Sequence, residues 1–220
     1  MAHRYKSYLP HQVSLDRQSD GALIMGSTMA LGPVARNTGE WLRYWADTTP
    51  QQIVIAERSG AGWRSLSYAE TLQQVEALAS GLLHTGIKKG DRIIVLSGAS
   101  VNHGVLKLAA QYIGAATVPL AEQYSLIEQA HDRLDFVADK VKPVLIYAED
   151  GQAFAQALNR PAFDKAGKLV SINPASGHLS FERLLGAPAH SGLDDAYAKV
   201  TPDTLAKILF TSGSTSMPKG

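Results

Sequence analysis

The sequence predicts an α/β fold: a largely parallel sheet with helices on both faces, preceded by a small β-hairpin region. Short apolar runs of strand length alternate with segments whose apolar residues recur at helical spacing. The run 92–96 is apolar after its first position, which is typical of a strand buried on both faces of a parallel sheet. The 220 residues, 45% hydrophobic and 19% charged, are enough for a substantial core in one or two domains.

Composition and charge exclude several classes of function. The 21 basic and 20 acidic residues are interspersed and give a net charge of +1, so we expect no nucleic-acid partner and no membrane partner. The absence of cysteine excludes disulfides, thiolate zinc sites, iron–sulfur clusters and cysteine nucleophiles, and it permits a reducing compartment. The sequence contains neither the apolar core of a signal peptide nor a run of about 18 apolar residues. We therefore expect a cytoplasmic protein.

The first elements predicted are a leader and a helix. Residues 1–36 form the leader, in which 22–25 can be an edge strand, and residues 37–220 form the main domain. Apolar residues on one broad face predict a helix over 37–45, which ends before Pro50. Trp41 and Trp45 are expected to anchor it in the core.

A hairpin and a long helix follow. Two strand-like runs, 53–57 and 63–66, are separated by a glycine-containing turn. Ser67 and Glu70 then form an S-x-x-E capping box that predicts the start of a helix, and Gly86 supplies its end. The buried stripe predicted for this helix consists of Leu72, Val75, Leu78, Ala79 and Leu82.

The rest of the domain continues the alternation of strands and helices. A second capping box, Ser125 with Glu128, predicts a helix that runs to about residue 140. Residues 173–199 read as a surface connection with one helical turn over 181–185. The other elements are strands over 92–96, 116–120, 144–147 and 168–172, and a helix over 102–113.

The last ten residues, TSGSTSMPKG, follow an apolar run of strand length over 205–210. Glycine and serine raise chain entropy, so a flexible terminus is one interpretation. A buried strand that leads into a hydroxyl-rich loop is the other, because ligands of α/β sheets bind beyond the carboxyl ends of strands. Gly213 lets backbone N–H groups approach an anion, and Lys219 adds a positive charge. The hydroxyl donors are Thr211, Ser212, Ser214 and Thr215.

Two common nucleotide-binding motifs are excluded by spacing. A Walker A loop needs a glycine before its lysine and a serine or threonine after it, whereas Lys219 lies between Pro218 and Gly220. No G-x-G-x-x-G follows a predicted strand, so a dinucleotide-binding Rossmann domain has little support.

The pattern T-S-G-S-T-x-x-P-K-G after an apolar strand resembles the phosphate-binding signature of the AMP-forming adenylating enzymes, which include acyl-CoA and aryl-CoA synthetases, luciferases and peptide-synthetase adenylation domains. Residues 63–70, 86–95 and 109–120 resemble further blocks of that family, in the same order and spacing. Within the family, the chain looks most like feruloyl-CoA synthases. The segments that carry this finer resemblance are 39–42, 56–58, 96–98, 124–126 and 205–212.

The resemblance implies an activity and a set of ligands. The fold is expected to be the N-terminal portion of the large domain of an adenylating enzyme. ATP, Mg²⁺ and CoA are the implied cofactors, and ferulate or a similar aryl carboxylic acid is the implied substrate. The loop would hold the β- and γ-phosphates while charge builds on the leaving pyrophosphate. The residues implied to contact phosphate are Thr211, Ser212, Gly213, Ser214, Thr215 and Lys219.

Two departures from the family pattern bear on activity. Ser216 stands where the family has glycine, and serine costs on the order of 1 kcal/mol if that position needs a positive φ, which would weaken ATP handling. The segments that bind adenine, ribose and magnesium and the C-terminal lysine used in adenylation are absent, and no catalytic or metal-binding residue is assigned here. We therefore expect a partial adenylation domain over 37–220, truncated at the phosphate loop, that does not catalyse the reaction alone.

Other interpretations stay open. One is a non-catalytic α/β module that serves in binding or assembly, and another is a different phosphate-binding α/β protein. The carboxylate pairs 149–150 and 194–195 are expected to cap turns or to face solvent. The histidines show no i, i+4 pair, so surface or hydrogen-bonded histidines are expected rather than a metal site. They are His84, His103, His131, His178 and His190.

Overall fold

Residues 12–211 and 217–220 are described by the structure, a computed structural model. The chain divides into two compact units, Met1–Val34 and Ala35–Gly220. The domain boundaries predicted from the sequence stay predictions.

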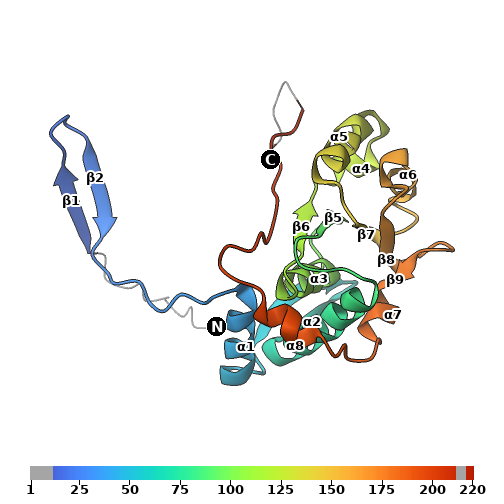
Figure 1. Cartoon of the computed structure of the whole chain (residues 1–220), viewed down its shortest axis with the longest axis horizontal. Coiled ribbons are helices and arrows are strands. Elements are labelled where there is room, and N and C mark those ends of the chain that lie inside the picture. The colour runs from blue at the N-terminus through green and yellow to red at the C-terminus, as the bar shows by residue number, and fades with distance from the viewer. Residues whose placement is uncertain (1–11, 212–216) are drawn as a thin grey trace. The chain divides into compact units, whose positions relative to one another are not determined.

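The first unit contains an antiparallel hairpin of β1 (Val13–Arg17) and β2 (Leu23–Ser27), in which Leu15 lies opposite Met25 (Figure 1). The predicted edge strand over 22–25 corresponds to β2. Its partner β1 was not predicted, because the segment VSLDR has only two apolar residues and lies in a polar stretch.

The second unit is built on five strands in the order β6-β5-β7-β8-β9, and every neighbouring pair is parallel. This confirms the predicted parallel sheet and the interior position of the strand 92–96. The predicted strands 92–96, 116–120, 144–147 and 168–172 are present, while β9 was not predicted. The strands are β5 (Arg92–Leu96), β6 (Ala116–Pro119), β7 (Leu145–Asp150), β8 (Gly167–Ile172) and β9 (Leu179–Ser180).

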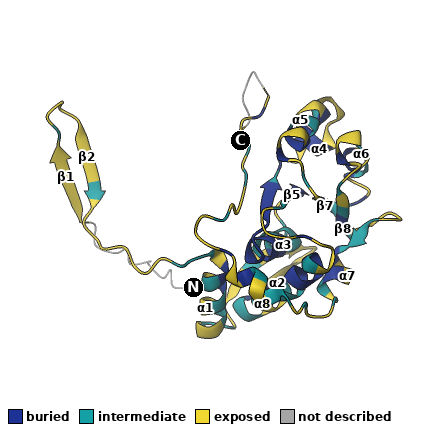
Figure 2. Ribbon diagram, in the orientation of Figure 1, coloured by how far each residue is buried: buried dark blue, intermediate teal, exposed yellow. Residues whose placement is uncertain are grey.

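Helices cover both faces of this sheet, and each face has its own apolar cluster (Figures 1 and 2). Successive β5 side chains alternate between them: Ile93 belongs to the first cluster and Ile94 to the second. The first face carries α1 (Thr38–Thr48), α2 (Tyr68–His84), α3 (Val101–Tyr112), α7 (Phe181–Leu185) and α8 (Leu193–Ala198). The second carries α4 (Gln123–Leu126), α5 (His131–Val141) and α6 (Ala155–Leu158).

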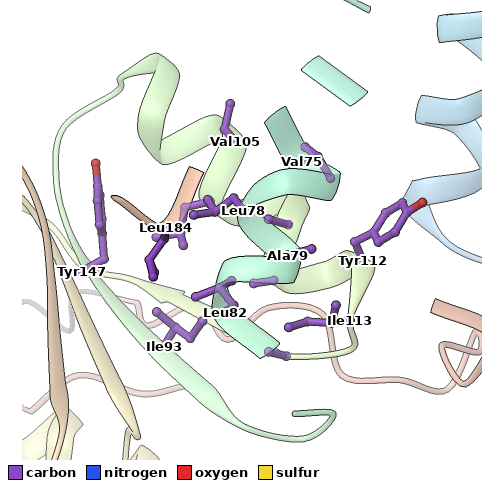
Figure 3. Packing of buried hydrophobic residues seen from close by; sticks show 14 of the residues in the cluster. Val75, Leu78, Ala79, Leu82, Ile93, Val105, Tyr112, Ile113, Tyr147 and Leu184 are labelled. Carbon is purple, nitrogen blue, oxygen red and sulfur yellow. The ribbon is translucent and has the colours of Figure 1, made fainter. Parts of the chain in front are cut away.

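The helix α2 packs in the first cluster, and its predicted buried stripe is confirmed except at Leu72, which is only partly buried. The capping box is formed, because the Ser67 hydroxyl accepts from the Glu70 amide while the Glu70 carboxylate accepts from the Ser67 amide. Figure 3 shows Val75, Leu78 and Leu82 among the packed side chains, and all three are fully buried. The predicted hairpin before α2 is also present, as β3 (Ile53–Ser59) and β4 (Gly62–Ser67).

The second predicted capping box is wrong. Ser125 lies inside α4 and is buried, while Glu128 begins the short 3-10 helix η1 (Glu128–Ala130). The helix α5 begins at His131, and its N-cap Ala130 provides no side-chain hydrogen bond. The chain forms α4 and η1 here in place of the start of one long helix. Packing of Tyr124 in the second cluster outweighs the local capping pattern.

The predicted core role of Trp41 and Trp45 is wrong as well. Their exposed fractions are 56% and 40%, whereas that of Leu42 is 6%. The buried face of α1 carries Gly39 and Leu42. Space on this face is tight, because a Cβ added at Gly39 would lie 2.7 Å from the Tyr197 ring and 3.0 Å from that of Tyr112. Large indoles have no room on that face.

The stretch 173–199 holds more structure than predicted. The helical turn over 181–185 is confirmed as α7, and β9 and α8 flank it. The helix α8 is held by Tyr197, whose ring stacks on that of Tyr112 at 4.5 Å between centroids. A second 3-10 helix, η2 (Pro161–Phe163), precedes β8.

Candidate functional site

The segment before the hydroxyl-rich loop runs along the free edge of β6. The Ile208 amide donates to the Thr117 carbonyl at 3.0 Å, and the Thr117 amide donates to the Ala206 carbonyl at 3.3 Å. This is a single parallel bridge, between Thr117 and Lys207, and no strand is formed.

The predicted buried strand over 205–210 is therefore wrong. Its side chains alternate in burial: Ile208 and Phe210 pack against the second cluster, while Leu205 and Leu209 are 52% and 60% exposed. The physical reason is that the side chains of an extended segment alternate between two faces, and among the described residues only the face of the second cluster is covered here.

Thr211 and Lys219 form an antiparallel bridge. The Thr211 amide donates to the Lys219 carbonyl at 2.8 Å, and the Lys219 amide donates to the Thr211 carbonyl at 3.3 Å. The Thr211 hydroxyl also donates to the Lys219 carbonyl, at 3.1 Å. The structure thus brings together two of the six residues predicted to bind phosphate. The other four, Ser212, Gly213, Ser214 and Thr215, lie outside the described residues.

A pocket of about 650 Å³ adjoins this bridge. Four cationic side chains line it, and none of the described residues that line it is acidic, so its charge favours an anion. Two of the four cations have hydrogen-bond or ion-pair partners: the Arg92 guanidinium donates to the carbonyls of Val141 and Gly90, and the Lys142 ammonium pairs with Asp139. Lys140 and Lys219 complete the set.

A second polar cluster lies where the strand order reverses, at the carboxyl ends of β5 and β7. In doubly wound sheets, that crevice is a common ligand site. Here Glu149, at the end of β7, accepts hydrogen bonds from the hydroxyls of Ser97 at 3.3 Å, Ser100 at 2.7 Å and Tyr147. These groups satisfy one another, so we interpret the cluster as a structural network. From the sequence, Glu149 was expected to cap a turn or to face solvent, and this role was not predicted.

The pKa values of two groups at this edge are shifted by their surroundings. Burial, followed by the Glu149 carboxylate, raises the pKa of the Tyr147 hydroxyl above its usual range. The neighbouring Asp150 matches the expected turn-capping role, since its carboxylate accepts from the Gln152 amide at 2.8 Å. That hydrogen bond, together with one from Asn173, lowers the pKa of Asp150.

Among the described residues, two histidines lie side by side. The rings of His84 and His190 meet at 4.7 Å between centroids, and His131 is buried and contacts the Ser125 carbonyl. Over residues 12–211 and 217–220, no group of three or more His, Asp and Glu side chains is arranged to hold a metal ion. We therefore assign no magnesium ligand to these residues.

A model of the family described as AMP-binding enzyme matches residues 42–220. Long-chain-fatty-acid–CoA ligase FadD15 of Mycobacterium bovis is 26% identical over 174 residues, which cover 78% of this chain and 28% of that protein. Tenellin synthetase of Beauveria bassiana is 36% identical over 163 residues, which cover 72% of this chain and 4% of that protein. The chain thus spans less than a third of the length of these relatives.

Solved structures share the fold. That of the fatty acyl-adenylate ligase from L. pneumophila, in complex with acyl adenylate and pyrophosphate, superposes with a TM-score of 0.63 at 22% identity. The match covers 84% of this chain and 30% of that one.

Proposed function

The chain belongs to the AMP-binding enzyme family, and from this premise we propose that it supplies the phosphate-binding part of an ATP-dependent carboxylic acid–CoA ligase. The observation that carries the proposal is the Thr211–Lys219 bridge. It pairs Thr211 with Lys219, and the sequence from 211 to 219 offers hydroxyl donors, a glycine and a lysine. The fold is the α/β fold of the N-terminal part of an adenylating-enzyme domain.

The proposed reaction has two steps. A carboxylate oxygen attacks the α-phosphorus of ATP, which forms an acyl-adenylate and releases pyrophosphate; the CoA thiol then attacks the acyl carbon, and AMP leaves. The bound Mg²⁺ would neutralise phosphate charge. The Lys219 ammonium, at the end of a flexible four-carbon stem, would follow the β- and γ-phosphates as charge builds on them. The donors proposed beside it are Ser212, Gly213, Ser214 and Thr215.

For the acid, we propose an aryl carboxylate such as ferulate. Support comes from the sequence segments that resemble feruloyl-CoA synthases, 39–42 and 124–126 among them. The names of the relatives point to other acids for those proteins, a long-chain fatty acid in one case. We also propose a cytoplasmic location, which suits a chain without cysteine. Within the described part of the chain, no helix combines the length and apolarity that a membrane span requires.

Binding of pyrophosphate and of ATP to the chain, measured by calorimetry in the presence of Mg²⁺, tests the phosphate-binding role. Lys219→Ala is expected to weaken pyrophosphate binding about tenfold, the equivalent of one charge-assisted hydrogen bond. Lys88→Ala removes an exposed cation from the loop before β5 and serves as the matched control, with affinity unchanged. Equal affinities for Lys219→Ala and the wild type, or binding of sugar phosphates without ATP or pyrophosphate, would overturn the proposal.

The acid is tested separately with non-hydrolysable acyl-adenylate analogues, on a chain extended by the adenine- and ribose-binding segments that the family resemblance implies to be absent from these residues. A feruloyl sulfamoyl-adenosine is expected to raise the melting temperature more than a palmitoyl analogue at equal concentration. A larger shift with the palmitoyl compound would refute the aryl acid and leave the adenylating role intact, whereas no shift with either would count against adenylate binding.

A further inference from the structure

Thr211 has only one proton to donate from its hydroxyl, and the structure shows where that proton goes. The hydroxyl donates to the Lys219 carbonyl at 3.1 Å, and the Thr211 amide donates to the same oxygen at 2.8 Å. A carbonyl oxygen has two lone pairs, so these two donors satisfy it. While the bond is intact, the Thr211 hydroxyl has no proton left for a phosphate oxygen.

We propose that Thr211 is a positioning residue, which fixes the backbone of Lys219 and so the starting point of its ammonium group, and that it does not itself bind phosphate. The proposal rests on the proposed function, because it gives Thr211 a different role within the same phosphate-binding segment. Lys219 remains the residue whose ammonium group binds the anion, and Thr211 fixes the position of the backbone that carries it.

The residues on either side of Lys219 support this role. Pro218 is buried, and the Gly220 backbone lies against the Phe210 ring, whose atoms are 2.8–3.0 Å from the place a Cβ of Gly220 would occupy. Phe210 in turn packs on the second cluster. Lys219 is therefore held through its neighbours on both sides and through Thr211 across the bridge, while its own side chain is exposed.

Two substitutions separate the hydroxyl from the shape of the side chain. Thr211→Val keeps the β-branched shape that favours an extended backbone and removes the donor. Thr211→Ser keeps the donor and removes the branch. If the Lys219 hydrogen bond is what matters, only the valine variant loses function. Thr204→Val is the matched control, because the Thr204 hydroxyl accepts from the Thr201 amide at 2.9 Å in the same segment, away from the bridge.

The experiment uses two measurements on the full chain. Solvent exchange of the Thr211 and Lys219 amide protons, followed by NMR without ligand, reports the bridge, and calorimetry with Mg²⁺ and pyrophosphate reports binding. Thr211→Val is expected to speed exchange and to weaken pyrophosphate binding about fivefold, the equivalent of one neutral hydrogen bond. Thr211→Ser is expected to restore both, and Thr204→Val to change neither.

The outcomes distinguish the two proposals. Weaker binding by Thr211→Val with wild-type amide exchange would mean that the hydroxyl contacts phosphate directly, and this would overturn the positioning role. Unchanged exchange and binding would overturn it as well. If wild-type chain binds neither pyrophosphate nor ATP, the proposed function fails, while the exchange measurements still decide whether Thr211 holds Lys219.

Discussion

Ser100 and Glu149 are 49 positions apart in the chain, and the Ser100 hydroxyl donates a hydrogen bond of 2.7 Å to the Glu149 carboxylate. The same hydroxyl oxygen accepts from the His103 amide at 3.1 Å and so caps the first turn of α3. One serine therefore joins the start of a helix to the end of the central strand β7.

Ser100→Ala removes both hydrogen bonds. We expect the free energy of unfolding to fall by about 1–2 kcal/mol, the cost of a lost N-cap plus a weakened carboxylate contact. Urea denaturation measures this loss. Ser180→Ala is the control, because Ser180 caps the five-residue helix α7 with a longer bond, 3.4 Å, and its loss should cost less. Equal losses for the two variants would contradict a special role of the Ser100–Glu149 contact.

Alkaline pH tests the buried tyrosines. The pKa of Tyr147 is raised by burial and then by Glu149, and that of Tyr112 is raised by burial and then by its hydrogen bond to Glu76. A tyrosine with a higher pKa in the folded state stabilises the fold fully below its unfolded pKa of about 10, and that stability is lost as pH rises above this value.

The unfolding free energy should therefore decrease above about pH 10. In Tyr147→Phe this decrease should be shallower, with the part due to Tyr112 remaining. Chemical denaturation across that interval measures the slope, and Tyr44→Phe, at an exposed position, should keep the wild-type slope. A Tyr147→Phe curve parallel to the wild type would rule the explanation out.

Substitution by alanine should change the stability of the fold in opposite directions at two helical glycines. At Gly81 in α2, a Cβ would lie 2.5 Å from the Leu184 carbonyl oxygen, which is backbone and cannot easily move. At Gly104 in α3, the nearest atom would be Cδ1 of Ile55 at 3.2 Å, the end of a flexible side chain. We expect Gly81→Ala to destabilise the fold by about 1–3 kcal/mol and Gly104→Ala to be neutral or stabilising by up to about 1 kcal/mol, since alanine favours a helix. Thermal denaturation of both variants checks the contrast, and a stabilised Gly81→Ala would contradict the close packing of α2 on α7.

Neighbouring residues of α1 should differ sharply. Leu42→Ala removes a side chain that is 6% exposed and should cost about 2–4 kcal/mol. Trp41→Ala removes a larger side chain that is 56% exposed, so a smaller loss is expected. Urea denaturation of the two variants decides which residue anchors the helix. A greater loss for Trp41→Ala would restore the indole as the core anchor.

The sequence by itself determined what depends on local order and periodicity. The run 92–96, apolar after its first position, predicted a central parallel strand, and Ser67 with Glu70 predicted the start of α2; both are confirmed. These succeeded because a strand buried on both faces has no polar position, and because a capping box is completed within four residues. The phosphate-binding loop was predicted from a hydroxyl-rich segment after an apolar run and from its resemblance to a family signature, and that prediction stays open to test.

Only the tertiary structure decided which of several compatible local choices is used. Ser125 and Glu128 have the same capping pattern, yet packing of Tyr124 places Ser125 inside α4. The indoles of α1 point outward because the rings of Tyr112 and Tyr197 fill the space beside Gly39. Contacts such as Ser100 with Glu149, or Thr211 with Lys219, join residues whose separation has no period for a sequence pattern to reveal. They arise when strands and helices pack, since the three-dimensional arrangement alone brings those atoms within hydrogen-bonding distance.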